Sequence, residues 1–305
     1  MVTRHTYATA DDLRDYLAGT TYSSGWTADA ATLRRVLEGA SDRINLYCGA
    51  GTFGPITDTH EFDIGSGTLR DSVQPILPTG RNDIVNTGTM ASIIRLPGWL
   101  ISATTVTAYS GTDRASNTVL TAGYNADYFL MPYNSSPKTI WKLNEDTADT
   151  LDAGQQTLTI LGEWGYTNNT ILVTTADAVG STTSTSVSVT SGTNFGPAQT
   201  ILIDSEQMYI TSISGNTLTV ERGVNGTTAA THSGGASAYR YDYPPLVIQA
   251  CLDIGKIMFR NRDMGSGGTI GGGDASMTTS ESEVRSVLMT LDDYRATATS
   301  GGVIF

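Results

Sequence analysis

Two stretches far apart in the chain repeat apolar residues with the period of a helix. In the first, over about residues 28 to 48, the apolar positions fall every three or four residues and therefore share one face. We expect Thr27 to cap this helix and Gly49 to end it. In the second, Pro244 and Pro245 open a helix that runs to about residue 262. The two apolar stripes consist of Ala30, Leu33, Leu37, Ala40, Ile44 and Tyr47, and of Val247, Ala250, Cys251, Ile254, Ile257 and Met258. Neither stripe is stable in water, so we expect the two helices to pack together.

A shorter helix is predicted ahead of the first long one, with Thr9 and Asp12 as its capping box and Gly19 at its end. From residue 50 to 165 the pattern changes to short alternating or apolar runs that are broken by Gly, Pro, Asn and Asp, which is typical of strands with one wet face. The predicted strands are 61–64, 73–77, 93–96, 101–109, 128–131, 139–143 and 157–164.

Between about residues 170 and 241 the composition shifts to Ser, Thr, Gly and Val, and we predict a small antiparallel β module. Four strands are expected, around 187–189, 201–203, 208–210 and 218–220, with turns at 204–206, 214–216 and 224–226. The module would begin after a strand that ends at Tyr166 and finish before the helix at Pro244. Removing it would leave an ordinary connection from strand to helix, so we interpret it as an insertion.

The C-terminal segment combines a flexible tether with another apolar stripe. Residues 265–273 are Gly-rich and would span about 15 to 20 Å. A capping box of Ser280 and Glu283 then precedes a helix of about 15 residues, which is marginal alone and must dock on something. We interpret this segment as an arm that binds a partner, and packing against the parent domain stays open as the alternative. The residues expected to form the grip are Val284, Val287, Leu288, Leu291, Val303, Ile304 and Phe305.

These patterns together predict an α+β fold in which a helical core domain has β strands between its helices. Residues 1–166 and 243–264 would form this core domain, residues 167–242 the inserted all-β domain, and residues 265–305 the tether and the C-terminal amphipathic arm.

Composition narrows the possible functions. The formal net charge is −12 and the pI is about 4.5, which argues against an electrostatic grip on DNA or RNA. Cys48 and Cys251 are too few for a disulfide framework, and we expect two buried free thiols. No apolar run approaches the ~20 residues of a membrane span and none resembles a signal peptide. We therefore expect a soluble protein made in a cytoplasm.

No motif predicts catalysis, a cofactor or a metal. His5, His60 and His232 show no zinc-binding spacing, and the Gly-rich stretch lacks the Lys of a phosphate-binding loop. Glu163 is a conceivable acid of a glycosidase pair, but no second carboxylate can be assigned to it. Asp204 and Glu206 are conceivable calcium ligands, although a polar hairpin turn explains them equally well. We predict a protein that is not an enzyme, with no catalytic, cofactor-binding or metal-binding residues.

The order of these elements carries a family resemblance. An N-terminal helix pair, a strand-rich middle, a strand end that reads GEWGY and the helix PPLVIQACLDIGKIMFRNRD together resemble the head-to-tail connector (adaptor, or head-completion) proteins of long-tailed bacteriophages. The likeness covers about residues 1–166 and 243–262. This chain departs from the family by carrying about 75 extra residues before the last helix. The extra segment, TILIDSEQMYITSISGNTLTVERGVNGTTAATHSGGA, is itself similar to a small β module that recurs in phage virion proteins.

The resemblance implies a structural virion protein at the neck of the particle. Such proteins form a ring, usually a dodecamer, beneath the portal, extend the DNA channel and offer the next neck or tail protein its platform. DNA would pass through without specific binding, and no membrane or cofactor would be involved. Two alternatives stay open: another neck, tail-completion or capsid-decorating virion protein, and a carbohydrate-active β protein in which residues 170–241 bind glycan and Glu163 acts as an acid.

Overall fold

The computed structural model shows a protein that is mostly β. Its described residues are 3–18, 29–49, 51–65, 84–86, 93–110, 114, 116–123, 126–134, 136–143, 154–264 and 275–295. Helices make up 28% and strands 38% of the structure. The prediction of a helical core domain with strands between its helices is therefore wrong. Each of the two sheets buries its own apolar residues, so the strands do not depend on the helices for a core.

The contacts divide the chain into two compact units. The first contains Met1–Gly49 and Asn168–Arg295, and the described part of the second lies within Ala50–Thr167. This division differs from the three parts predicted from the sequence. The β module belongs to the same unit as the helices, while the strands of residues 51–167 form a unit of their own.

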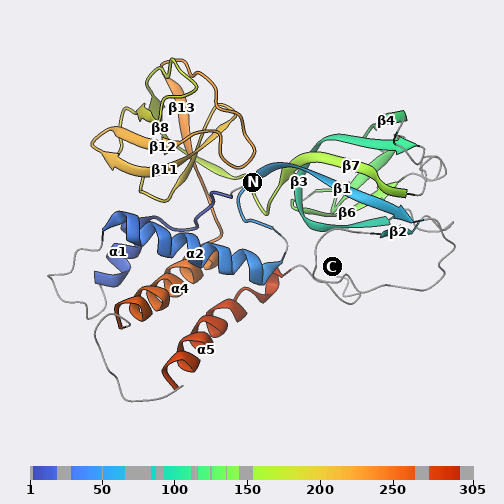
Figure 1. The fold of residues 1–305 in the computed structure, drawn as a ribbon. Helices are drawn as coiled ribbons and strands as arrows, with labels where there is room; N and C mark the ends of the chain where they lie inside the picture. The colour runs from blue at the N-terminus through green and yellow to red at the C-terminus, as the bar shows by residue number, and fades with distance from the viewer. Residues whose placement is uncertain are drawn as a thin grey trace. The chain divides into compact units, whose positions relative to one another are not determined.

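The predicted N-terminal helices are present (Figure 1). Helix α1 spans Ala10–Ala18, and its capping box is confirmed, because Thr9 N donates to Asp12 Oδ2 at 2.9 Å and Asp12 N to Thr9 Oγ1 at 3.1 Å. Helix α2 spans Ala30–Cys48 and ends at Gly49, whose φ of 67° suits a residue without a side chain. Its N-cap is Asp29, which accepts from Ala31 N, rather than Thr27, which lies outside the described residues.

The predicted pairing of the two long helices is confirmed. Helix α4, Pro245–Met264, packs against α2, and their facing apolar residues are buried. The helices approach closely at Gly39, where an added Cβ would lie 2.9 Å from Met258 Cε. Cys48 and Cys251 are both buried free thiols, and Cys251 Sγ lies 3.5 Å from Ser41 Oγ.

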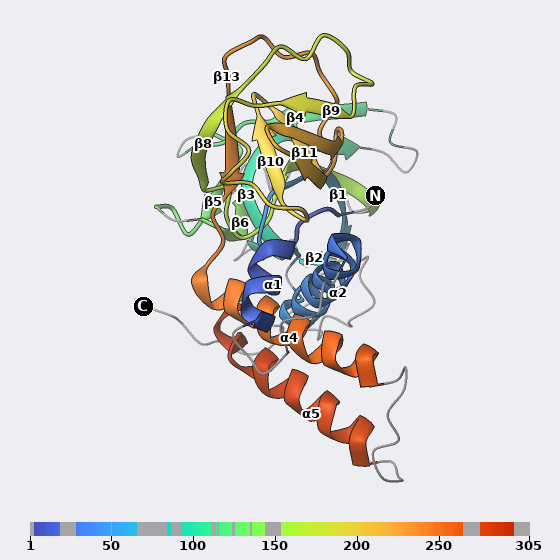
Figure 2. The same cartoon turned by 90° about the vertical axis from the view of Figure 1, so that its left-hand side faces the viewer.

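The C-terminal helix begins earlier than the capping box suggested. Helix α5 spans Ala275–Met289, so Ser280 lies inside it and does not cap it. A short 3₁₀ helix, Asp292–Tyr294, follows. Helices α4 and α5 lie side by side in both views (Figures 1 and 2).

The β module is a six-stranded antiparallel sheet with the order β8-β13-β10-β11-β12-β9. The strands are β8 Thr170–Ala176, β9 Ser186–Ser188, β10 Thr200–Ile203, β11 Glu206–Ser214, β12 Thr217–Glu221 and β13 Ala236–Tyr241. The four predicted strands are confirmed, and β8 and β13 were missed. A bridge between Ala176 and Val189, together with a 2.9 Å bond from Thr190 N to Thr175 O, joins β8 to the end of β9. The sheet therefore closes on itself as a small barrel.

The second unit is a seven-stranded sheet. Its order is β2-β1-β7-β3-β6-β5, with β4 paired to β3, and every pair is antiparallel except β1 with β2. The strands are β1 Ile56–Gly65, β2 Ile84–Asn86, β3 Ile93–Ser110, β4 Ser116–Leu120, β5 Tyr128–Met131, β6 Lys138–Leu143 and β7 Gly154–Trp164. The strand predicted at 73–77 lies outside the described residues.

Strand β3 joins two strands that the sequence suggested were separate. Pro97 and Gly98 interrupt the apolar pattern, yet the backbone stays extended and absorbs them as a register shift between Arg95 and Leu100 against β6. Leu100 is fully buried in the core of this unit, together with Phe62, Val106, Leu158, Ile160 and Trp164.

The close packing at the centre of this sheet generates a prediction. Gly162 lies in β7 between β1 and β3, and a Cβ there would stand 2.3 Å from Ser102 O. Gly162→Ala should therefore destabilise the unit by about 1–3 kcal/mol, because backbone must move to relieve the clash. Chemical denaturation followed by circular dichroism measures the loss. Gly180→Ala, at a position with nothing within 4 Å, is the control; equal stability of the two variants would contradict the prediction.

Candidate interaction site

The predicted arm lies partly on its own chain. In α5 and just after it, Val284 is 6% exposed and Leu291 is fully buried. Three polar contacts hold the segment: Arg260 of α4 pairs with Glu283, the Tyr47 hydroxyl of α2 donates to Asp292, and the Arg295 guanidinium lies 5.1 Å from the centre of the Tyr47 ring. These contacts define a seat for α5 on α4, with a second attachment at the end of α2.

The other residues of the arm are less covered. Val287 and Leu288 are half-buried, and the adjacent Met289 is 56% exposed. Val303, Ile304 and Phe305 lie outside the described residues. The seat thus takes Val284 and Leu291 and leaves an apolar strip of Val287, Leu288 and Met289 partly open to solvent.

Sequence reasoning missed the polar half of this attachment. Tyr47 was assigned to the buried stripe of α2, but its hydroxyl reaches Asp292, and this hydrogen bond is the largest cause of the raised pKa of Tyr47. Burial raises that pKa further, while the Arg295 charge lowers it. No sequence spacing links residues 47 and 292, so only the fold could bring them together.

The most connected polar group of the barrel is a buried carboxylate. Glu206 is fully buried, and Arg222, whose side chain is 6% exposed, donates to both of its oxygens at 2.6 and 2.7 Å. The backbone N–H groups of Gly223 and Ala230 donate to it at 3.0 and 2.9 Å. His232 Nε2 lies 2.9 Å from the same carboxylate.

His232 joins a second carboxylate to this cluster. Its Nδ1 lies 2.7 Å from Asp204 Oδ2, so both ring nitrogens lie within hydrogen-bond distance of carboxylate oxygens. Arg222 also donates to Ser181 O at 3.2 Å and to Ser184 O at 2.9 Å. The four side chains Asp204, Glu206, Arg222 and His232 are called the ion cluster below. Through Arg222 the cluster fastens the β8–β9 loop to the barrel.

The electrostatics of the ion cluster indicate a structural role. Burial alone would raise the pKa of Glu206, but hydrogen bonds from Arg222, Ala230 N and His232 outweigh it, and the pKa lies below its ordinary value. An ionised carboxylate that is satisfied in this way has no lone pair directed at a ligand. In the described part of the chain, no group of three His, Cys, Asp or Glu side chains is arranged to hold a metal ion.

The N-terminal segment ties the barrel to the helices. Arg4 N donates to Asn225 Oδ1 at 2.7 Å, and Ala10 N donates to Pro197 O at 2.9 Å. The Arg4 side chain pairs with Glu221 of β12 at 2.8 Å and lies 3.6 Å from Glu38 of α2. The sequence offered no sign of this role, because residues 3–8 have neither periodicity nor a turn motif.

His5 sits at the centre of this connection. Asn225 Nδ2 donates to His5 Nε2 at 3.1 Å, because the Asn225 oxygen already accepts from Arg4 N. His5 Nδ1 therefore carries the proton and donates to the Tyr243 hydroxyl at 2.9 Å. Burial raises the pKa of Tyr243 well above its ordinary value. His5 therefore has a structural role: it joins the N-terminal segment to Asn225 of the barrel and to Tyr243.

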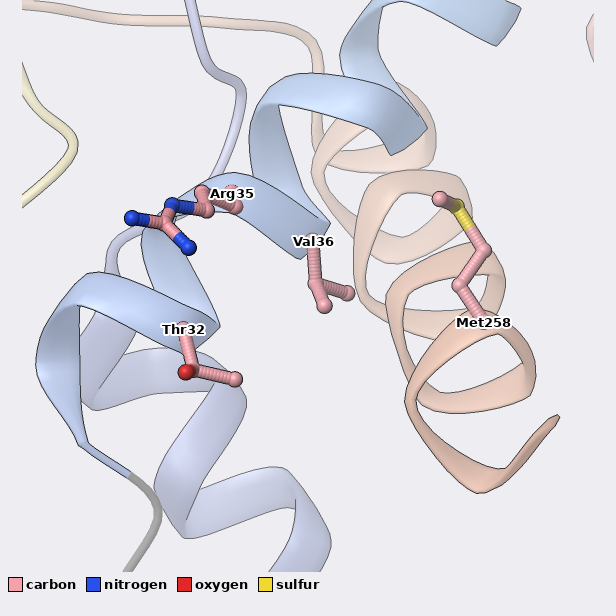
Figure 3. Close-up of a pocket in the computed structure, with 4 residues that line it drawn as sticks. All are labelled: Thr32, Arg35, Val36 and Met258. Carbon is pink, nitrogen blue, oxygen red and sulfur yellow. The ribbon is translucent and has the colours of Figure 1, made fainter. Parts of the chain in front are cut away.

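Two hollows lie among the described residues of the first unit. One, of about 280 Å³, is lined by Thr32, Arg35, Val36 and Met258, and Figure 3 shows Val36 and Met258 on the facing sides of α2 and α4 while Arg35 extends away from α4. The other, of about 360 Å³, is lined by Thr3, Arg4, His5, Thr6, Glu38, Asp42 and Tyr209. Neither gathers convergent polar groups around an apolar pocket in the manner of a small-molecule site.

The fold does not bring the remaining candidate residues, Glu163 and His60, together into a site. Glu163 of β7 is half-buried and accepts a hydrogen bond from Ser102 Oγ at 3.4 Å. His60 stacks on Trp164 with ring centroids 3.8 Å apart, and burial lowers its pKa. Among the described helices, none is both long and apolar enough to cross a bilayer.

Comparisons with protein-family models, with curated proteins and with solved structures found no match for this chain.

The ion cluster generates a prediction about stability. Arg222→Met leaves Glu206 buried without its cation, so we expect a loss of about 3–5 kcal/mol at neutral pH. Because the folded pKa of Glu206 lies below its ordinary value of 4.5, the stability that its ionisation contributes is present above that pH and is lost as pH falls through the folded pKa. The difference between the variant and the parent should therefore shrink in acid, as measured by urea denaturation from pH 7 to pH 3.

The matched control is Arg14→Met, which removes an exposed pair with Asp11 and should cost less than about 1 kcal/mol. A loss at Arg222 no larger than that at Arg14 would show that the ion cluster does not stabilise the barrel.

Proposed function

We propose that this protein is a structural head-to-tail connector of a long-tailed bacteriophage. The observation that carries the proposal is the C-terminal segment: a helix on a Gly-rich tether whose apolar residues Val287, Leu288 and Met289 stay partly uncovered. A tethered helix with an unfinished apolar face is suited to gripping a second subunit. The resemblance of residues 1–166 and 243–262 to connector proteins agrees with this.

The proposed partners follow from that role. The protein would form a ring with copies of itself, usually a dodecamer, bind the portal on one side and offer the next neck or tail protein a platform on the other. It would be assembled in the cytoplasm of the host and reside at the neck of the virion. The net charge of −12 suits a channel through which DNA slides, because like charges repel and no phosphate is held.

A second candidate is another structural virion protein, with a tail-completion or capsid-decorating role. The observation that favours it is the barrel, which has a core of its own. Its sequence resembles a small β module that recurs in phage virion proteins. A decorating protein would share the barrel but would not form a ring beneath the portal.

Disruption of the gene in its phage tests the proposal. Lysates viewed by negative-stain electron microscopy should contain complete free tails beside tailless heads that have lost DNA, because the joint between them is missing. Normally joined particles that adsorb or penetrate poorly would overturn the connector role and favour a surface or glycan-directed one.

A substitution tests the grip of the arm. Val287→Asp with Leu288→Asp places two charges on the open strip, and burying them at an interface would be costly. We expect attachment to particles to fall at least tenfold, measured by complementation with the variant gene, while the melting temperature of the isolated protein changes little. Leu291→Asp is unsuitable because that residue is fully buried. Val119→Asp, at a 59% exposed apolar position of the other unit, is the control and should complement normally.

A further inference from the structure

His5 is buried where the N-terminal segment, residues 3–8, meets the barrel. It is 4% exposed, and its partner Asn225 is 1% exposed. Asn225 Nδ2 donates to His5 Nε2 at 3.1 Å, and His5 Nδ1 donates to the Tyr243 hydroxyl at 2.9 Å. The rings of Tyr241 and Tyr243 meet the imidazole edge-on, with centroids 5.4 and 6.2 Å away. This arrangement uses the neutral imidazole, with one nitrogen as donor and the other as acceptor.

A backbone donor fixes the orientation of the Asn225 amide. Arg4 N donates to Asn225 Oδ1 at 2.7 Å, and a backbone N–H can only donate. Asn225 Nδ2 also donates to Gln207 Oε1 at 2.8 Å. Turning the amide round would set its NH₂ group against the N–H of Arg4. Asn225 therefore presents a donor to His5, and His5 Nε2 must accept.

A second proton on His5 disrupts this chain of hydrogen bonds. The imidazolium carries an N–H on both ring nitrogens, so Nε2 and Asn225 Nδ2 would become two donors 3.1 Å apart. Either this bond or the bond from Arg4 N to Asn225 is then lost, and a buried donor without an acceptor costs free energy. Both bonds attach the N-terminal segment to the barrel, so the proton weakens that attachment.

The charged groups around His5 do not compensate for this loss. The Arg4 side chain pairs with Glu221 of β12 at 2.8 Å and lies 3.6 Å from Glu38 of α2, so these carboxylates already face a cation. Asp42 of α2 is exposed and lines the same hollow as Arg4 and His5. The positive charge of Arg4, on the adjacent residue, disfavours a second cation. The other titratable side chains packed nearby are tyrosines, which are neutral below pH 8: Tyr7, Tyr209, Tyr241 and Tyr243.

We propose that His5 and Asn225 form an acid-sensitive latch for the N-terminal segment. Above about pH 6.5, where a free imidazole is neutral, the latch holds the segment on the barrel. The attached segment favours the neutral form and the open segment accepts the second proton, so the latch stabilises the attached state above this pH and loses that effect as the pH falls. Tyr7 N, which donates to Ser41 Oγ of α2 at 3.3 Å, lies in the same segment. Opening of the latch therefore loosens the joint between the barrel and the helices, whatever the role of the protein in a virion.

Hydrogen–deuterium exchange of the full chain at pH 7.5 and pH 5.5 tests the latch, with each rate divided by the intrinsic rate at the same pH. The readout is the peptide of residues 3–10, in which Arg4 N, Tyr7 N and Ala10 N donate hydrogen bonds. We expect its protection to fall about tenfold at pH 5.5, because proton uptake by an ordinary histidine favours the open segment by that factor. Protection in α4 should change less than twofold. Ordinary carboxylates titrate near pH 4, below this window.

Three variants separate His5 from the other histidines. His5→Gln cannot take up the proton, so protection of residues 3–10 should be equal at both pH values. His60→Gln, in the other unit, is the control and should lose protection as the parent does. Asn225→Asp replaces the amide donor by a carboxylate that accepts from the imidazolium, so the loss in acid should be absent or reversed.

Equal protection of residues 3–10 at both pH values in the parent would overturn the latch, and so would a tenfold fall that persists in His5→Gln. If His5→Gln already leaves the segment unprotected at pH 7.5, Asn225→Asp decides the matter. A fall in that variant as large as in the parent overturns the proposal, and the absence of the fall supports it.

Discussion

The packing of α2 against α4 is the contact on which the first unit depends. The two helices are separated by nearly two hundred residues, yet their apolar stripes meet, and Gly39 of α2 lies opposite Met258 of α4. Exposing either apolar stripe to water is unfavourable, so each helix needs a partner that covers it. Everything between them must therefore leave this helical group and return to it. The chain does so by forming a complete second unit and then a closed barrel before α4 begins.

The barrel is nevertheless bound firmly to the helices. A segment of residues 3–9 passes between them and is fixed by hydrogen bonds to Asn225, Thr200 and Ala198 of the barrel region. Tyr209 of β11 donates to Glu38 of α2 at 2.9 Å, and burial raises the pKa of that tyrosine far above its ordinary value. These are polar contacts inside a low-dielectric region, where an unmet partner is costly. The module reads as an insertion in sequence, but its contacts make it part of the helical unit.

The two kinds of buried polar structure in this unit have different consequences. The ion cluster lies within the barrel and fastens its own loops, so its effect is confined to the module. The network of His5, Asn225 and Tyr243 crosses from the N-terminal segment to the barrel and to Tyr243, two residues before α4, so it joins parts that are distant in the chain. By contrast, the described part of α5 and the residues just after it bury only Val284 and Leu291 among their apolar side chains.

The sequence by itself determined the local elements whose periodicity was strong: α1 with its capping box, the stripes of α2 and α4, and four strands of the barrel. It also determined that α2 needed α4. Only the tertiary structure decided how much of the fold is β. The local pattern ends a strand at Pro97 and Gly98, whereas β3 continues past them with a register shift. Only the fold could join Tyr47 to Asp292, Glu206 to Arg222 and His232, or Arg4 to Glu38. These contacts depend on which faces meet after long loops close, and no local spacing records that.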